Sequence, residues 1–552
     1  MKKLFWSVNA GFISVLPILY LVSYLILGVK RGPFYWVANQ DPDYAYLGNS
    51  LKLALFQAPS HTDHPGTPLQ IMGAVLIRGE HFLNSIANPR STDLVTDVLT
   101  HPEMYLWTIH TTLVLLTACA LLLLGFGTFR LCQNLPLAIL IQSSPFLIIG
   151  AHFVIEPSRV SPDVLVICFS QLLALLLVYY LYRENTAYRE NAAQSGKWLI
   201  GLGVIFGLGM ATKVTFLATI WFFLLIKGTR RKILALLVAV ATFIIATAPI
   251  ISQYPRMIGW FESLATHTGP YRTGGRGLFN PVEIWKNFGV LVSNAQIFIG
   301  ILFLSTVVSV ALLLLIYVDK KRFKNAKQNL LRKSAYLLFL TTLVWWTQIA
   351  MTLTEFPKIR YLDPSLGLVG FMLFLLTLCL TLLTTQWLTE RTRLSSRQVA
   401  QRLAAIALSI CWIIGIQQVN LASQSIGKFA ALRRNDLAQI ETLYNSEKYR
   451  TCIKVNSWRT SSIESSLHFM NIWSGKSFGP FLDKLHPGII IYKSETNRFQ
   501  SYSQPIPASQ ITGQDCVLLQ SLTIPKNTRN DIQNQKFSDV YVGKVESVYR
   551  FK

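Results

Sequence analysis

Long apolar segments, separated by short polar loops, occupy most of the chain before residue 424. Most of them approach 20 residues, and an α-helix of about 20 apolar residues crosses a hydrocarbon core of roughly 30 Å. The pattern therefore predicts a polytopic α-helical membrane protein with about 11 transmembrane helices. The expected spans are 4–29, 106–129, 136–154, 163–182, 198–212, 214–227, 233–253, 289–318, 335–353, 365–388 and 403–421.

The remaining segment, 424–552, has a different pattern. Apolar positions with helical spacing occur around residues 437–443, and short apolar runs follow at 452–455, 488–492, 516–519 and 540–542. Runs of this length, separated by polar turns, are typical of β-strands. We therefore predict a small soluble α/β domain over 424–552, after a transmembrane domain over 1–423.

Composition agrees with a membrane protein: 51% of residues are hydrophobic and 14% are charged, with a mean hydropathy of +0.39. The net charge of +24 comes from 51 Lys and Arg against 27 Asp and Glu. Much of the excess lies in short loops between apolar segments, at 183–189, 227–232, 320–333 and 391–402. Cytoplasmic loops of membrane proteins carry such an excess. The charge therefore indicates topology, and we expect no nucleic-acid partner.

The segment 198–227 decides the topology. As one tilted helix it would leave the basic loop 227–232 outside the membrane, whereas a tight hairpin with Lys213 at its tip keeps that loop inside. We favour the hairpin. With Lys2 and Lys3 inside, the loops 30–105 and 254–288 and the C-terminal domain then lie on the exterior (periplasmic) side of a cell (inner or plasma) membrane. In this oxidising compartment we expect Cys452 and Cys516 to pair, and two buried thiols are the alternative.

Acidic and imidazole side chains gather in the first long loop, although the chain is poor in acid overall. Asp41-Pro-Asp43-Tyr44 is followed by His61-Thr-Asp63-His64-Pro-Gly-Thr-Pro68. A carboxylate here can accept a proton from an acceptor hydroxyl or amine. The Asp41/Asp43 pair can instead hold a divalent metal, Mg²⁺ or Mn²⁺, or simply form a turn. We favour Asp43 as the base, Asp41 as its closest rival, and Asp63 and His64 as support.

Three cations lie at the predicted outer ends of spans: Arg159, Lys213 and Arg360, the last beside Tyr361. Arg binds phosphate through a two-pronged fork and Lys as a point charge. Each of them alone is better explained by contact with lipid headgroups. Because all three share a face with the acidic loop, we predict that they bind a donor phosphate. A glycine-rich loop at 267–277 could contact the substrate, act as a lid over the site, or serve only as a linker. Its candidates for such contacts are His267, Tyr271 and Arg272.

Four landmarks occur in a set order: Asp41-Pro-Asp43-Tyr44, His64-Pro-Gly-Thr-Pro68, Gly207-Leu-x-x-x-Thr-Lys213 and Arg360-Tyr-x-x-Pro364. Together they resemble the GT-C superfamily of membrane glycosyltransferases, in particular the branch of protein O-mannosyltransferases and lipid A aminoarabinose transferases. The likeness covers about residues 1–420. That branch usually carries adjacent Asp-Glu in its first loop, whereas a proline separates two aspartates here, which leaves the base open between them.

The resemblance implies transfer of a hexosyl or pentosyl group from a polyprenyl-phosphate-linked sugar to a lipid, glycan or protein acceptor at the outer face, with inversion. A loop carboxylate would activate the acceptor, and cations would hold the departing lipid phosphate. Two other functions stay open at this point. A lipid or glycolipid transporter would place ionisable residues at mid-membrane depth. A non-catalytic assembly subunit would use the C-terminal domain for docking.

Overall fold

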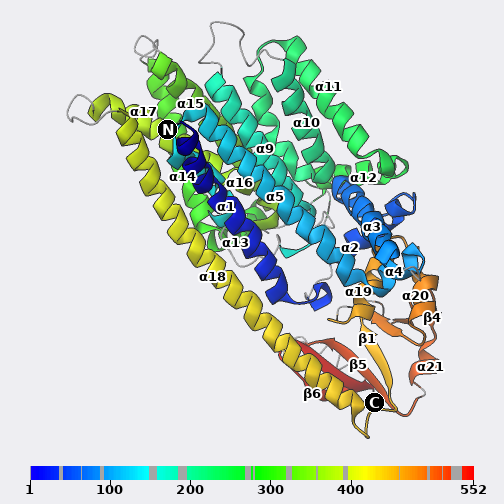
Figure 1. The fold of residues 1–552 in the computed structure, drawn as a ribbon. Coiled ribbons are helices and arrows are strands. Elements are labelled where there is room, and N and C mark those ends of the chain that lie inside the picture. The colour runs from blue at the N-terminus through cyan, green and yellow to red at the C-terminus, as the bar shows by residue number, and fades with distance from the viewer. Residues whose placement is uncertain are drawn as a thin grey trace.

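The structure is a computed structural model, in which a bundle of helices is joined to a small C-terminal sheet domain (Figure 1). The N-terminus lies at one end of the bundle, and the C-terminus lies at the far end of the molecule, in the sheet domain. The structure describes residues 2–551 apart from 37–40, 64, 88–91, 148–157, 184–195, 268–274, 276, 278–279, 319–325, 356–358, 389–395, 459, 494–495, 497, 513 and 524–536.

Helices form the whole bundle. In its first half they are α1 (Lys2–Arg31), η1 (Phe34–Trp36), α2 (Asp43–Ala54), α3 (Thr67–Ala87), α4 (Leu94–Thr100), α5 (Pro102–Cys132), α6 (Leu135–Leu140), η2 (Ile141–Ser143), α7 (Ser144–Leu147), α9 (Pro162–Arg183), α10 (Gly196–Thr212) and η5 (Val214–Leu225). In its second half they are α11 (Thr229–Ala246), η6 (Ala248–Gln253), α12 (Tyr254–Thr266), α13 (Pro281–Asn294), α14 (Gln296–Val318), α15 (Ala326–Glu355), η8 (Ile359–Leu362), α16 (Asp363–Gly367), α17 (Val369–Leu388) and α18 (Ser396–Asn445).

Among the described residues, six helices are long and apolar enough to cross a membrane, or up to eight if each bent pair counts as one span. The bent pairs are α11 with the η6/α12 segment, at 83°, and η8/α16 with α17, at 46°. A multi-pass membrane protein is therefore supported, whereas eleven crossings are not shown. The difference arises in part because several predicted spans correspond to bent helices or to short ones, such as the apolar helix Val214–Leu225.

The segment 198–227 folds as two short helices, as expected. Helix α10 ends at Thr212, Lys213 is extended, and η5 begins at Val214. The ring of Phe206 lies 6.5 Å from the ring of Phe216 and 5.2 Å from that of Phe223. Residues 10 and 17 positions apart on one straight helix would be about 15 and 25 Å apart. The chain therefore turns back at Lys213.

The C-terminal domain is a seven-stranded mixed sheet in the order β4-β3-β2-β1-β5-β7-β6. Strands β2, β1 and β5 are parallel, and the remaining pairs are antiparallel. Four strands lie where the sequence predicts them. The elements are β1 (Ile453–Ser457), α19 (Ile463–Trp473), α20 (Gly479–Leu485), β2 (Ile490–Lys493), β3 (Arg498–Gln500), β4 (Pro505–Ile506), α21 (Ala508–Thr512), β5 (Val517–Leu522), β6 (Phe537–Val542) and β7 (Glu546–Phe551).

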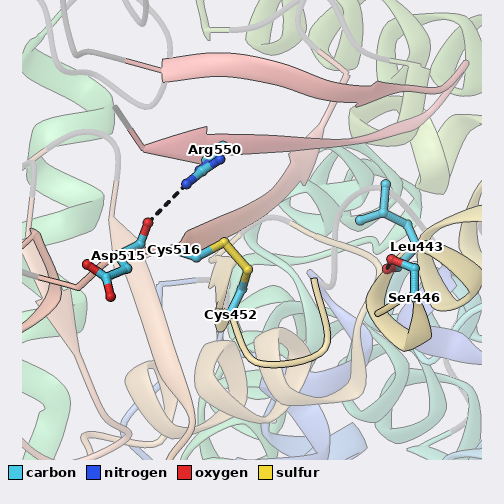
Figure 2. Close-up of a disulfide and its surroundings, with 6 residues drawn as sticks. All are labelled: Leu443, Ser446, Cys452, Asp515, Cys516 and Arg550. Carbon is cyan, nitrogen blue, oxygen red and sulfur yellow. Dashed lines mark hydrogen bonds between the residues drawn. A yellow bond between two sulfur atoms is a disulfide. The ribbon is translucent and has the colours of Figure 1, made fainter. Parts of the chain in front are cut away.

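A disulfide between Cys452 and Cys516 joins the segment before β1 to the segment before β5 (Figure 2). The two Cα atoms are 4.8 Å apart, within the range that a disulfide requires. The predicted pairing is therefore confirmed. It closes a loop of 64 residues, which contains α19, α20 and the β2–β4 edge of the sheet.

The sheet domain contacts the bundle through α18, α19 and α20, the last of which packs on α4. Helix α18 runs without interruption from Ser396 to Asn445 and carries its last turns against the sheet (Figure 1). Helix α19 packs on α2, and their side chains form one hydrophobic core. The predicted domain boundary at residue 424 therefore falls inside a helix, and one continuous backbone connects the two parts.

Candidate functional site

Asp43 is the first residue of α2 and is fully buried. Arg159 donates to its Oδ2 from Nε at 2.8 Å, and Arg159 Nη2 lies 2.7 Å from the same oxygen. The backbone N–H of Val160 donates to Oδ1 at 2.6 Å. A carboxylate in the first turn of a helix is also favoured by the helix dipole. Both oxygens of Asp43 are thus engaged, and they join α2 to the segment that precedes α9.

Asp41 lies just before α2 and has a half-buried side chain. Its backbone carbonyl accepts a hydrogen bond from Nη2 of Arg159. The same guanidinium therefore binds Asp43 through its carboxylate and Asp41 through its main chain. This leaves the two aspartates, which look equivalent in the sequence, in different surroundings: one enclosed and one reaching the protein surface.

Lys213, at the turn between α10 and η5, is buried and ion-paired. Its Nζ donates to Asp163, to Oδ2 of Asp363 at 2.8 Å and to the carbonyl of Arg360 at 2.9 Å. An ammonium group has three donors, and these three acceptors match them. Both aspartates lie at the starts of helices, where negative charge is favoured. Lys213 therefore fastens α9, η8 and α16 to the α10–η5 turn.

Arg360 and Tyr361 lie beside this lysine. Arg360 is half-buried, and its guanidinium carbon is 5.4 Å from the centroid of the Tyr361 ring. Tyr361 is buried, with Lys213 Nζ 5.2 Å from the same centroid. The aromatic face can stabilise both cations. Of the three cations expected to bind phosphate, Arg360 is the one whose side chain is not buried.

The loop charges and the span-end charges meet around Tyr46, on α2. Burial raises the pKa of the Tyr46 hydroxyl well above its usual 10, and the negative charges of Asp41, Asp163 and Asp63 raise this pKa further. The positive charge of Arg360 lowers it. Four charged groups from distant parts of the sequence are therefore within electrostatic range of one hydroxyl. We call the following residues the site cluster: Asp41, Asp43, Tyr46, Asp63, Arg159, Asp163, Lys213, Arg360, Tyr361 and Asp363.

The turn at Gly66 packs tightly against Tyr46. Gly66 has a positive φ of 59°, and a Cβ atom there would lie 2.4 Å from the Tyr46 oxygen. Its N–H donates to the carbonyl of Thr212 at 3.1 Å. A side chain at this position would clash and would also strain the backbone. The glycine therefore allows the His-Pro turn to sit between α2 and the Lys213 turn.

Asp63 and His61 lie on the loop that leads into this turn. Asp63 is 3.3 Å from Arg256 of α12, and Arg256 also donates to the carbonyl of Ser60 at 3.0 Å. His61 is buried edge-on against the rings of Tyr46, at 5.5 Å, and Trp473, at 4.8 Å. Burial lowers the pKa of His61 below its usual 6.5, which favours the neutral ring.

Of the remaining candidates, the structure describes His267. His64, Tyr271 and Arg272 lie outside the described residues. His267 follows the last residue of α12, with its Nδ1 2.9 Å from Oγ1 of Thr266. It is 11 positions from Arg256, or about 16 Å along a helix.

The metal alternative does not fit the described residues. Within that part of the chain, no three His, Cys, Asp or Glu side chains are grouped so that they could hold a metal ion. In the Asp41/Asp43 pair, both oxygens of Asp43 already accept hydrogen bonds, from Arg159 and from the N–H of Val160. We therefore derive no step that uses a metal.

Three residues of the site cluster are not among those that the sequence motifs predict for the site, namely Tyr46, Asp163 and Asp363. A signal for the two aspartates was present, since each adjoins a proline, as Pro162-Asp163 and Asp363-Pro364, at the start of an apolar segment. A carboxylate at such a position becomes buried when the helix packs and needs a cation. Tyr46 carries no comparable signal, because a tyrosine on an apolar helix face is usual in a hydrophobic core.

A cavity of about 450 Å³ opens at the opposite end of the bundle, away from the site cluster. It lies among the start of α1, the end of α5 and the start of α18. Its lining consists of Asn9, Phe129, Gln133, Leu135, Pro136, Gln398, Gln401, Arg402 and Ala405.

No protein-family model and no curated protein sequence matches the chain. Among solved structures, it is similar to ArnT from Cupriavidus metallidurans bound to undecaprenyl phosphate, at 9% identity and a TM-score of 0.48, over 98% of each chain. The apo state of that protein matches at 10% identity and 0.48, over 100% of this chain and 98% of the other. The apo oligosaccharyltransferase of Archaeoglobus fulgidus matches at 14% identity and 0.33, over 82% of this chain and 64% of that one.

Identities and TM-scores this low assign neither a family nor a role to any residue. The likeness of this chain to the GT-C superfamily therefore rests on its sequence motifs.

Proposed function

We propose that the protein transfers a sugar from a polyprenyl-phosphate donor to an acceptor at the outer face of the membrane, with inversion at the anomeric carbon. The acceptor is a lipid, a glycan or a protein, and the sugar is a hexose or a pentose. The supporting observation is a pair of linked charge groups. Arg159 binds the Asp43 carboxylate and the Asp41 carbonyl, and Lys213 binds Asp163, Asp363 and the Arg360 carbonyl. Charges from both groups, those of Asp41, Asp163 and Arg360, act on the Tyr46 hydroxyl. An acid beside a phosphate-binding cation is the arrangement that this reaction requires.

Asp41 is the base in this proposal. The acceptor hydroxyl or amine attacks the anomeric carbon, its proton passes to the Asp41 carboxylate, and the bond to the lipid phosphate breaks. Asp41 has the accessibility for this step because it is half-buried, whereas Asp43 is enclosed with both oxygens engaged. The role we favoured for Asp43 from the sequence therefore passes to its neighbour. Asp43 instead fixes Arg159 and, through it, the main chain of Asp41.

Arg360 binds the phosphate of the donor in this proposal. Negative charge develops on the phosphate as the lipid departs, so a positioned cation lowers the barrier. Lys213 contributes by holding the Arg360 main chain rather than by direct contact, because its three donors meet protein acceptors. Arg159 likewise acts through Asp43. Tyr361 supports the Arg360 guanidinium with its ring.

The transporter alternative is less consistent with where these charges lie. Asp163 and Asp363 begin helices, Lys213 follows the end of one, and Arg360 precedes α16. The charges of the site cluster thus gather where helices end, whereas transport sites use ionisable residues near the midplane of the membrane.

Purified protein in lipid nanodiscs tests the proposal directly. A panel of polyprenyl-phosphate sugars is supplied with membrane lipid and protein acceptors, and both the transferred sugar and the released polyprenyl phosphate are measured. We expect Arg360→Ala to weaken binding of polyprenyl phosphate, while Arg332→Ala, at an exposed position on α15, leaves it unchanged. Movement of the donor across the bilayer without sugar transfer would support a transporter instead.

The proposal also places the site cluster and the C-terminal domain outside the membrane. Reporter fusions after Lys232 and after Lys552 should then report opposite sides. The same side for both fusions would refute this topology, whatever the outcome of the transfer assay.

A further inference from the structure

Asn49, on α2, connects three separate segments. It is fully buried. Its Nδ2 donates to the carbonyl of Ala45 at 2.7 Å and to the carbonyl of Trp473 at 3.1 Å. Its Oδ1 accepts from the N–H of Ser60 at 2.7 Å and from that of His61 at 3.0 Å. A side-chain amide has two donors and two acceptor lone pairs, so all four positions are used.

These bonds cross from the bundle to the C-terminal domain. Trp473 is the last residue of α19. The two helices touch closely, since a Cβ atom on Gly48 would lie 2.6 Å from the Met470 side chain. The ring of Trp473 also packs on His61 at 4.8 Å. A helix of the C-terminal domain therefore rests directly on the loop that carries Asp63.

The same domain is fixed from its other side by α18. Asp436 accepts hydrogen bonds from the N–H groups of Val545, at 2.6 Å, and Glu546, at 3.1 Å, and from the hydroxyl of Tyr541, at 2.9 Å. Arg433 and Glu546 form a fully buried ion pair, with Nη2 and Oε1 3.8 Å apart. We call Arg433, Asp436 and Glu546 the tail joint. With this anchorage, α19 has a defined place against α2.

We propose that the C-terminal domain sets the geometry of the site cluster, with Asn49 as the positioning residue through which it acts. The Trp473 carbonyl faces the amide nitrogen and so fixes the direction of the amide oxygen. That oxygen then holds the backbone at Ser60 and His61, which fixes the His61 ring against Tyr46 and the start of the segment that carries Asp63. The catalytic part of this inference rests on the proposed transferase function and gives the C-terminal domain a role in it.

Two substitutions at Asn49 test the inference in the full-length protein. Asn49→Asp is nearly isosteric and keeps acceptors for Ser60 and His61, but it places a negative oxygen against the Trp473 carbonyl. Asn49→Ser removes the bridge without a buried charge, in case the first variant does not fold. The matched control is Asn471→Asp, because Asn471 is an equally buried asparagine of α19 whose bonds, to Tyr502 and Phe478, stay inside the C-terminal domain.

Amide hydrogen exchange, without substrate, is the first measurement. We expect faster exchange at residues 60–62 in both Asn49 variants. Asn49→Ser removes the acceptor, and in Asn49→Asp repulsion by the Trp473 carbonyl displaces the carboxylate. Asn471→Asp should show wild-type exchange at these residues. Turnover per folded protein is the second. We expect kcat to fall on the order of 10²-fold in the Asn49 variants, with the KM for donor changed little, because misplaced groups lower the rate rather than ground-state binding. The control should lose stability and retain kcat.

Several results would overturn the inference. They are unchanged exchange at residues 60–62 in the Asn49 variants, unchanged kcat in them, or an equal loss of kcat in Asn471→Asp. Failure of both Asn49 variants to fold, while the control folds, would show that Asn49 serves folding alone. If the wild-type protein transfers no sugar, the proposed function fails, and hydrogen exchange still decides whether the C-terminal domain orders the loop.

Discussion

The site cluster and the tail joint both pair arginine with carboxylate away from water, but they differ in access to solvent. In the site cluster, buried pairs such as Asp43 with Arg159 lie beside half-buried Asp41 and Arg360. In the tail joint, Arg433 and Glu546 are both fully buried. Within the described part of the chain, the Arg433 nitrogens have no hydrogen-bond partner.

This difference distinguishes a functional site from a purely structural contact. Buried ion pairs alone do not indicate chemistry, because desolvation offsets much of their attraction and their main effect is to fix geometry. A site additionally needs charged groups that a substrate can reach. Of these two regions, the site cluster has both buried ion pairs and charged groups that a substrate can reach. Its buried pairs therefore act as a frame, meaning that they hold Asp41 and Arg360 in position.

The largest expected effect is on transfer in Asp41→Asn. A general base contributes typically 10²–10⁴-fold, so we expect a loss of that order in turnover, with little change in thermal unfolding because Asp41 is half-buried. Sugar transfer in nanodiscs and a thermal melt provide the measurements. Full activity in Asp41→Asn, together with an inactive but stable Asp43→Asn, would mean that Asp43 is the base. The contrast drawn here between buried structural groups and accessible reactive groups would then fail.

The second effect is on stability in Asp43→Asn. The substitution leaves the buried Arg159 without its counter-charge, and removal of one partner of a buried pair costs about 3–5 kcal/mol of unfolding free energy. Chemical denaturation of the full chain in detergent measures it. Asp63→Asn is the control, because its partner Arg256 has a side chain 53% exposed and such a pair contributes only about 0–1 kcal/mol. Equal losses in both variants would contradict the assignment of Asp43 as a frame residue.

The third effect is in the tail joint. Glu546 accepts hydrogen bonds from the N–H and hydroxyl of Ser461 and pairs with Arg433. Glu546→Gln should lower the unfolding free energy by about 1.5–3 kcal/mol, the usual contribution of a hydrogen bond to a charged group. Turnover per folded protein should fall less than in the Asn49 variants, because Asp436 still accepts hydrogen bonds from the N–H groups of Val545 and residue 546 and keeps the sheet on α18. A fall in kcat without loss of stability would show that the joint takes part in the reaction.

The smallest effect is in Arg360→Lys. Lysine keeps the positive charge but loses the two-pronged fork, so we expect roughly tenfold weaker binding of polyprenyl phosphate, or about 1.4 kcal/mol. Arg332→Lys, on the exposed surface of α15, serves as the control. An unchanged dissociation constant in Arg360→Lys would mean that Arg360 acts as a point charge or not at all.

Much of the fold follows from local pattern. Apolar segments give the helices, the charge rule gives the turn at Lys213, and short apolar runs give β1, β2, β5 and β6. Strands β3 and β4 have three and two residues, too few to show a period, and they form only through pairing with their neighbours. Hydropathy alone does not determine the number of membrane crossings, because it does not show bends such as the 83° break after α11.

The site was partly predictable for the same reason. The motifs identify which segments contain Asp41, Asp43, Lys213 and Arg360, and the fold brings those segments together. Burial of an individual side chain depends on distant partners instead: Arg159 meets Asp43 across 116 positions of sequence. The sequence therefore indicates which residues belong to the site. Which of them are buried in ion pairs and which are accessible to a substrate depends on packing in the folded protein.

Helix α18 has a mechanical consequence. Its 50 residues make it roughly 75 Å long, more than twice the roughly 30 Å thickness of the hydrocarbon core. Its last turns are fixed to the sheet by the tail joint. A tilt of this helix by about 5° would displace its far end by roughly 6 Å over that length. The orientation of this one helix in the bundle therefore decides where the C-terminal domain lies relative to the loop held by Asn49.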